Sequence, residues 1–126
     1  MGLIEDFYTR LSTYPGLVVL IGDRIWPVEA EQGEKRPHCV YEQVSGGRRY
    51  SHNGYSNLQR PRMQVNCYAG TYEIAKDIAA QVTEALESWF SVKTGGNRQQ
   101  NEIDMIDPAT TFYVVVVDFF IWYKGV

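Results

Sequence analysis

The chain has 126 residues, of which 44% are hydrophobic, so it has the size of one domain and enough apolar side chains for a core without disulfides or metals. Its net charge of −3 argues against a dedicated DNA-binding domain, which usually carries a basic surface. The sequence contains neither a signal segment nor an apolar run of the ~20 residues that span a membrane. We therefore expect a single domain over residues 1–126 that is made in the cytoplasm and has no membrane partner.

The first third of the chain predicts one short helix followed by less regular segments. Apolar residues at helical spacing over residues 3–11 predict an amphipathic helix, which the Tyr-Pro-Gly sequence at 14–16 ends. Residues 17–21 form a short apolar run whose type is open, and residues 24–27 predict a brief extended segment. Residues 28–36 are polar without periodicity, so we expect a surface loop there.

A long β-hairpin is predicted in the middle of the chain. Residues 38–44 are rich in strand-forming residues, and apolar and polar residues alternate over residues 62–68. Between them, Asn53-Gly54 is a strong turn signal, because a type I′ turn needs positive φ at both central residues. Two strands of about 15 residues would span roughly 50 Å, more than a domain of this size covers, so we expect residues 45–60 to project as a hairpin arm.

The register of this hairpin is left open by the sequence. A two-residue turn places Val40 opposite Cys67, whereas a slip of one residue pairs Cys39 with Cys67. A bulge is expected near the glycine pair at 46–47. Two cysteines do not form a disulfide framework, so we expect both to be reduced core residues.

An amphipathic helix follows directly on the second strand of the hairpin. Thr71 is a good N-cap, and Glu73 places a carboxylate in the first turn, where the helix dipole favours it. Large apolar residues recur every three or four positions, with alanines beside them that allow close packing on a sheet. We expect this helix to cover the sheet with the stripe formed by Ile74, Ile78, Val82, Leu86, Trp89 and Phe90.

The last part of the sequence predicts two more strands. Residues 101–106 indicate a short strand, and residues 112–123 are apolar on both alternating faces, which is typical of a strand buried on both sides. One helix layer covers only one face, so the other face is a candidate for cover by another subunit. The predicted fold class is α+β, with an antiparallel sheet of about four strands, a long hairpin and two helices packed on one face.

The charge of the chain is unevenly distributed, and its basic part coincides with the predicted arm. Residues 46–62 contain four arginines and no acid. Arginine and tyrosine suit contacts between protein subunits, but they also suit phosphate pairing and base stacking in a small nucleic-acid-binding module, which is the alternative function. The candidate contact residues of the arm are Arg48, Arg49, Tyr50, His52, Asn53, Tyr55, Arg60 and Arg62.

No combination of residues indicates a catalytic, metal or cofactor site. The only histidines are His38 and His52, and the CxxC, HxxxH and HExxH patterns of metal ligands do not occur. We expect His38 to be a hydrogen-bonded structural residue. Asp118 invites a catalytic role, but no partner acid, base or nucleophile can be placed near it, so pairing with an arginine or contact with a neighbouring subunit is expected instead. We expect no enzyme activity, no metal and no cofactor.

Several segments are specific when they are taken together and in order. They are DRIWP at 23–27, PHCVYEQVSG at 37–46, RMQVNCY at 62–68 passing straight into an alanine-rich helix, and DFFIWY at 118–123. Their order and spacing resemble the tail-completion family of long-tailed bacteriophages, whose members are also called tail terminators or tail-to-head joining proteins. The resemblance runs over nearly the whole chain.

This resemblance implies a structural protein of the virion. Such a protein would form a ring of six copies at the head-proximal end of the tail tube, stop tail growth and join the tail to the head connector. Its partners would be other copies of itself, the tail tube protein and the head connector or stopper protein. DNA would pass through the ring without specific binding, which suits an acidic protein. The location would be the head–tail interface of the virion, and the host cytoplasm during assembly. Interface residues would be the arm residues named above together with Asp118 and Trp122.

Overall fold

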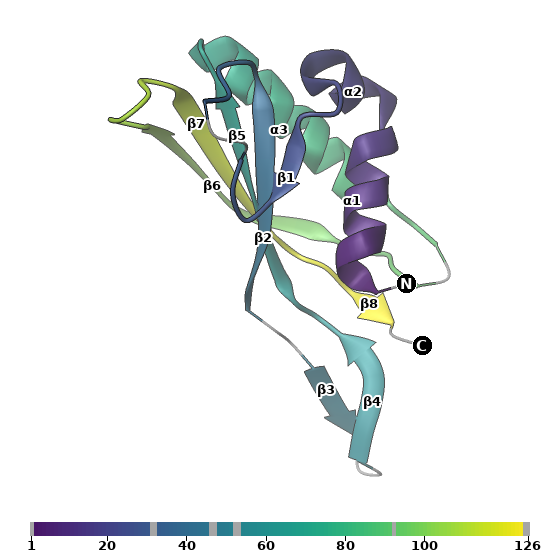
Figure 1. Cartoon of the computed structure of the whole chain (residues 1–126). Helices are drawn as coiled ribbons and strands as arrows, with labels where there is room; N and C mark the ends of the chain where they lie inside the picture. Colours follow the sequence, from purple (N-terminus) through teal and green to yellow (C-terminus); the bar gives the residue numbers. More distant parts are fainter. Residues whose placement is uncertain (1, 31–32, 46–47, 52–53, 92, 125–126) are drawn as a thin grey trace.

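The computed structural model describes residues 2–30, 33–45, 48–51, 54–91 and 93–124, and for residues 48–51 and 54–59 it describes the backbone alone. Within these residues the chain forms three helices, a five-stranded sheet and a three-stranded sheet (Figure 1). None of the described helices has the length and apolar character needed to cross a membrane.

The three helices are α1 (Leu3–Thr13), α2 (Pro15–Ile21) and α3 (Tyr72–Glu87). The apolar run whose type the sequence left open belongs to α2, and Pro15 occupies its first position, where a missing N–H is tolerated. The prediction that the apolar stripe of α3 reaches Phe90 is wrong. The helix ends three residues earlier, and the Phe90 side chain is 70% exposed.

The main sheet contains β1 (Ile25–Pro27), β2 (His38–Ser45), β5 (Arg62–Ala69), β6 (Arg98–Ile106) and β7 (Tyr113–Phe120). Their order is β1-β2-β5-β7-β6, with β1 parallel to β2 and the other neighbours antiparallel. The α+β class is confirmed, but the sheet is mixed and has five strands, so the prediction of about four antiparallel strands is partly wrong: it lacks β1 and the parallel pairing of β1 with β2. A segment as short as β1 carries no pattern that reveals its partner or its direction.

A second sheet continues the hairpin beyond the main sheet. It contains β3 (Arg48–Ser51), β4 (Gly54–Gln59) and β8 (Tyr123–Lys124), in the order β3-β4-β8. Figure 1 shows β3 and β4 extending below the five-stranded sheet. The terminal segment predicted as one strand is thus divided into β7 and β8. The backbone N–H of Ile121 still donates to the carbonyl of Pro61 at 3.0 Å, in the register of β5 and β7, but Pro61 has no N–H to return the bond, and the ladder ends there.

The register of the hairpin places the two cysteines opposite each other. Cys39 pairs with Cys67, and a shift between Gln43 and Ser45 forms a bulge close to the glycine pair. Both cysteines are free and fully buried, and burial raises the pKa of the Cys67 thiol. The prediction that both are reduced core residues is confirmed.

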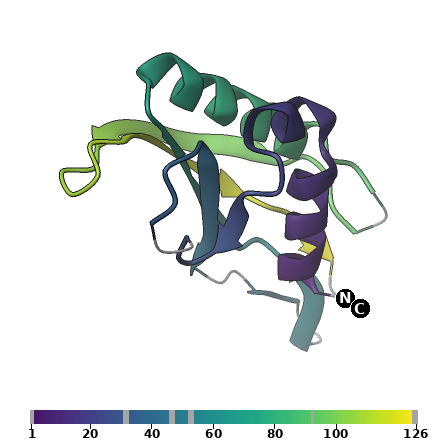
Figure 2. The same cartoon turned by 45° about the horizontal axis from the view of Figure 1, so that its top comes forward.

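All three helices lie on one side of the main sheet, where the prediction had two, and the core lies between these layers (Figures 1 and 2). α3 packs on β5 and β7 through buried alanines such as Ala75 and Ala79. α1 reaches the sheet through Phe7, whose ring centroid lies 5.6 Å from that of Tyr41. A single continuous cluster of apolar side chains therefore joins the helices to one face of the sheet.

No described helix covers the opposite face of the sheet, which we call the outer face. Val114 and Asp118 are buried within it, whereas Val116 and Phe120 are half-buried, so β7 is only partly enclosed on this side. Because side chains alternate along each strand, the register of β5, β6 and β7 assigns to this face Arg62, Gln64, Asn66, Tyr68, Arg98, Asn101, Ile103, Met105, Val114, Val116, Asp118 and Phe120.

Thr71→Ala is expected to lower the free energy of unfolding by about 1 kcal/mol. The Thr71 hydroxyl oxygen accepts a hydrogen bond from the backbone N–H of Ile74 at 3.3 Å, and alanine leaves that donor without a partner. Denaturant titration followed by circular dichroism measures the change. Thr71→Ser keeps the hydroxyl and is the control, so equal stability of the two variants would contradict the capping role.

Candidate functional site

An ion pair on the outer face joins the two central strands of the sheet. Arg62 on β5 donates from Nη2 to Oδ2 of Asp118 on β7 at 2.6 Å. The side chain of Asp118 is 8% exposed and that of Arg62 is 40% exposed, so the carboxylate is enclosed while the guanidinium partly faces solvent. Of the two arrangements expected for Asp118, the structure shows the pairing with an arginine. The buried Nε of Arg62 and Oδ1 of Asp118 have no hydrogen-bond partner among the described residues.

The preceding arginine stacks on aromatic rings. The guanidinium carbon of Arg60 lies 4.4 Å from the ring centroid of Phe120 and 5.5 Å from that of Trp122, distances at which a ring face attracts a cation. Nearby, β8 pairs with β4. These contacts fasten the root of the hairpin to the segment that follows β7. We call Arg60, Arg62, Asp118, Phe120 and Trp122 the arm base.

The structure brings together four of the ten predicted interface residues, and all four belong to the arm base. Phe120 is the one member that sequence reasoning missed. Its position two residues after Asp118 in an alternating strand was a usable signal, because such residues share a face. The other six predicted residues are Arg48, Arg49 and Tyr50 on β3 and Tyr55 on β4, where the backbone alone is described, and His52 and Asn53, which lie outside the described residues.

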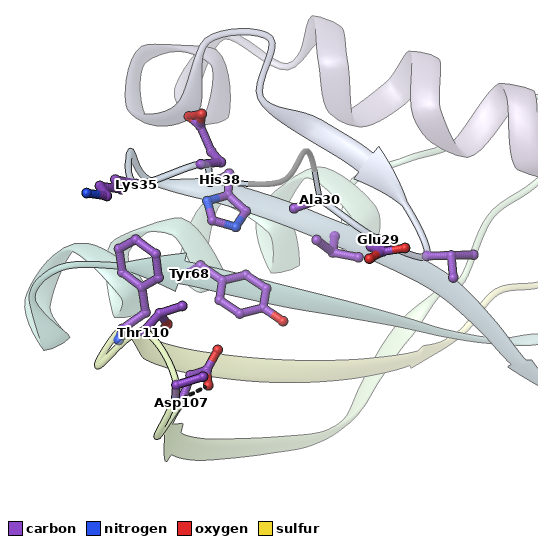
Figure 3. Close-up of a pocket in the computed structure, with 13 residues that line it drawn as sticks. Glu29, Ala30, Lys35, His38, Tyr68, Asp107 and Thr110 are labelled. Atoms are coloured by element: carbon purple, nitrogen blue, oxygen red, sulfur yellow. Dashed lines mark hydrogen bonds between the residues drawn. The ribbon is translucent and has the colours of Figure 1, made fainter.

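A cleft of about 810 Å³ opens at the other end of the sheet (Figure 3). Three aromatic rings meet in it: the His38 ring stacks on that of Tyr68 with centroids 4.7 Å apart, and the Phe112 ring meets His38 edge-on at 5.8 Å. Sequence reasoning missed this cleft, because its walls come from three separate segments. It is lined by Val28, Glu29, Ala30, Gly33, Glu34, Lys35, His38, Val40, Tyr68, Asp107, Ala109, Thr110 and Phe112.

The histidine of this cleft has a structural environment. Nδ1 of His38 lies 2.7 Å from the carbonyl oxygen of Arg36 and donates to it, so the prediction of a hydrogen-bonded structural histidine is confirmed. Burial lowers the pKa of His38, which keeps the ring neutral near pH 7. Across the part of the chain that the structure describes, no cluster of three or more His, Cys, Asp or Glu side chains is placed to hold a metal ion.

A network of charged side chains ties the edge strand β6 to α3. Lys76 donates to Oδ1 of Asp104 at 3.0 Å and to the carboxylate of Glu102, and the Tyr72 hydroxyl donates to Oδ2 of Asp104 at 2.7 Å. The bond to Glu102 raises the pKa of Lys76, the bond from Lys76 lowers the pKa of Glu102, and the bond from Tyr72 lowers the pKa of Asp104. Glu102 and Asp104 therefore stay charged on the helix side of the strand.

The fold is shared with a protein of known structure. A chain of the solved structure "Virion of native gene transfer agent (GTA) particle" is 15% identical to this chain and superposes with a TM-score of 0.72, and the match covers 94% of this chain and 92% of that chain. At this level of identity the likeness establishes the fold alone. Comparison with curated protein sequences finds no match.

A family profile matches the sequence itself. The profile described as "Tail completion protein gp17" covers residues 5–124, from the first turn of α1 to the end of β8. The match includes both the arm base and the segments of the cleft, and it confirms the resemblance noted in the sequence. The chain therefore belongs to the tail completion protein gp17 family, a family of structural virion proteins.

Proposed function

We propose that six copies of this protein form a ring at the head-proximal end of a phage tail tube, where the ring ends tail growth and joins the tail to the head connector. The observation that carries this proposal is the family match over residues 5–124. The likeness of the whole fold to a chain of a gene transfer agent virion supports it, because that chain also works in an assembled particle. The partners are then further copies of the chain, the tail tube protein and the head connector or stopper protein. The location is the head–tail interface, reached from the host cytoplasm during assembly.

A closed ring needs two different surfaces on each subunit, because its contacts run head to tail. The arm base and the hairpin lie at one end of the main sheet, where Arg62 on β5 pairs with Phe120 on β7. The second half of β6 and the cleft lie at the opposite end. This separation supports a head-to-tail arrangement, in which one end of a subunit contacts the other end of the next.

The four arginines of residues 46–62 are the basis of the alternative function, nucleic-acid binding. Arg62 pairs with Asp118, and Arg60 stacks on Phe120 and Trp122, so two of the four arginines already have partners within the subunit. A net charge of −3 also repels the phosphates of DNA. These features favour contacts with protein over contacts with phosphate, in agreement with DNA that passes through the ring without specific binding.

Purified protein is expected to form a cap with sixfold symmetry on one end of isolated tail tubes. Ring formation by the protein alone depends on its concentration, because a partner that binds the assembled form stabilises it. Electron microscopy of capped tubes and sedimentation of the free protein measure the two steps. Protein that stays as single subunits and binds neither end of the tubes would contradict the proposal.

Arg60→Ala is expected to loosen the arm base, since it removes a cation held near two aromatic rings and about 1 kcal/mol of attraction. Amides of β8 should then exchange with solvent faster, while those of β5 should not change. Hydrogen exchange followed by mass spectrometry measures both strands in one sample. Arg60→Lys keeps the positive charge and should show a smaller effect. Unchanged exchange in β8 of the alanine variant would exclude the clamping role.

Arg62→Met is expected to lower the free energy of unfolding by roughly 1–3 kcal/mol, because it leaves the enclosed Asp118 carboxylate without its partner. Adding Asp118→Asn to the same chain removes the unpaired charge and should recover part of the loss. Arg98→Met, on an exposed side chain of the edge strand, is the matched control and should stay within about 0.5 kcal/mol of the parent. Denaturant titration measures the free energy of unfolding of each variant. If the losses from the Arg62→Met and Asp118→Asn substitutions simply add up in the double variant, the two side chains are not coupled and the prediction is wrong.

A further inference from the structure

The strand β6 leaves a long open edge on the main sheet. It is the last strand in the order, it has nine residues, and Figure 1 shows no element of the described chain on its outer side. Ile103, Met105 and Ile106 are 48%, 51% and 56% exposed. Sheet edges of this length and apolar character are usually covered or interrupted, since they can pair with another chain. The open edge therefore requires an explanation.

The backbone of β6 shows which residues are available for pairing. The N–H of Asp107 donates to the carbonyl of Phe112 at 2.9 Å, so Asp107 faces β7. Hydrogen-bonding direction alternates along a strand, so the backbone groups of Asp104 and Ile106 point away from β7. Nearer the start of the strand, the N–H of Glu102 donates to Oδ1 of Asn101 at 3.0 Å. The open part of the edge is thus the second half of β6.

The charge around this half of β6 is acidic. Residues 72–79 of α3 and residues 102–107 contain one base, Lys76, which bonds to Glu102 and Asp104, while Arg98 lies at the other end of β6. The five acids of these two segments are Glu73, Asp77, Glu102, Asp104 and Asp107. The hairpin has the opposite charge, because residues 46–62 contain four arginines and no acid. Two of these arginines, Arg48 and Arg49, belong to β3, which is itself an edge strand because β4 lies between β3 and β8.

The acidic second half of β6 and the basic strand β3 cannot meet within one subunit. The hairpin leaves the sheet at the end where Arg62 pairs with Phe120, and the open half of β6 lies at the end where Ala69 pairs with Tyr113. Seven residues of extended strand separate these ends, a distance of about 23 Å. A contact between them must therefore join two copies of the chain.

We propose that the open half of β6 in one copy binds strand β3 of the hairpin in the next copy, so that the main sheet of one subunit is extended by a strand of its neighbour. The occupant is a second copy of this chain, selected by the charge difference between the two edges. This inference rests on the proposed ring and specifies the contact that closes it. Strand addition supplies backbone hydrogen bonds, while the opposite charges set register and specificity.

The test uses proline at a position whose N–H points outward. Asp104→Pro removes that donor without removing a bond to β7, whereas Asp104→Ala removes the same carboxylate and keeps the donor. Asp104→Pro is expected to abolish assembly at concentrations at which Asp104→Ala still assembles. Sedimentation measures the assembled fraction, and circular dichroism of the same samples shows that both variants are folded. Equal assembly of the two variants would overturn the inference.

A mixing experiment tests whether the contact runs from the arm to the edge. The double variant Arg48→Glu, Arg49→Glu has a disabled arm and an intact edge, and Asp104→Pro has an intact arm and a disabled edge. Each is expected to remain a single subunit alone, and an equal mixture is expected to form pairs and nothing larger, because one working contact remains. A mixture that stays as single subunits would overturn the inference.

The result also separates this inference from the proposed function. If the parent protein assembles and caps tubes while Asp104→Pro does so equally well, the ring stands and the β6 contact is wrong. If the parent protein neither assembles nor caps tubes, the proposed function itself fails. Assembly of the parent that weakens as salt rises from 50 to about 500 mM would support the charge selection, since salt screens exposed charges beyond a few Å.

Discussion

The pairing of β5 with β7 is the constraint on which the rest of the structure depends. It runs without a bulge from the Arg62–Phe120 pair to the Ala69–Tyr113 pair, and every second residue of β5 is buried. Since α3 follows β5 directly and packs on both strands, this register decides which side chains enter the core. A slip of one residue would turn Val65 toward the outer face and expose it, because side chains alternate along a strand.

Covering one face of the sheet leaves the other face, the two edges and the hairpin to make contacts. The helix side is joined to the sheet by a continuous apolar cluster, so it contributes stability. The arm base then anchors the hairpin at one end of the sheet, and β6 ends in an open edge at the other. In the proposed ring, this division would separate the part that folds from the parts that make contacts between subunits.

The sequence predicted those parts of the fold and site that depend on neighbours along the chain. The helix capped by Thr71 and the alternating strand through Val65 follow from residue type and spacing, whereas for Asp118 the sequence left open an arginine partner or a neighbouring subunit, and the fold decided for Arg62. The direction of β1, the cleft at His38 and the role of Phe120 did not follow, because each depends on segments that are distant in the sequence. The sequence shows that Glu102 and Asp104 occupy alternate positions of one strand. Their bonds to Lys76 could not be predicted, because they depend on the position of α3 over the sheet.

By itself the sequence determined the α+β class, the amphipathic helix α3, the strand before it and, through the order of its segments, the family. These features are local, since periodicity and capping act within a few residues. The tertiary structure alone decided the register that pairs Cys39 with Cys67, the mixed direction of the sheet and the division of the terminal segment into β7 and β8. It also decided which arginines have partners and which edge stays open. Those outcomes depend on the packing of distant segments, where several local arrangements of similar energy compete and burial of the common core selects one.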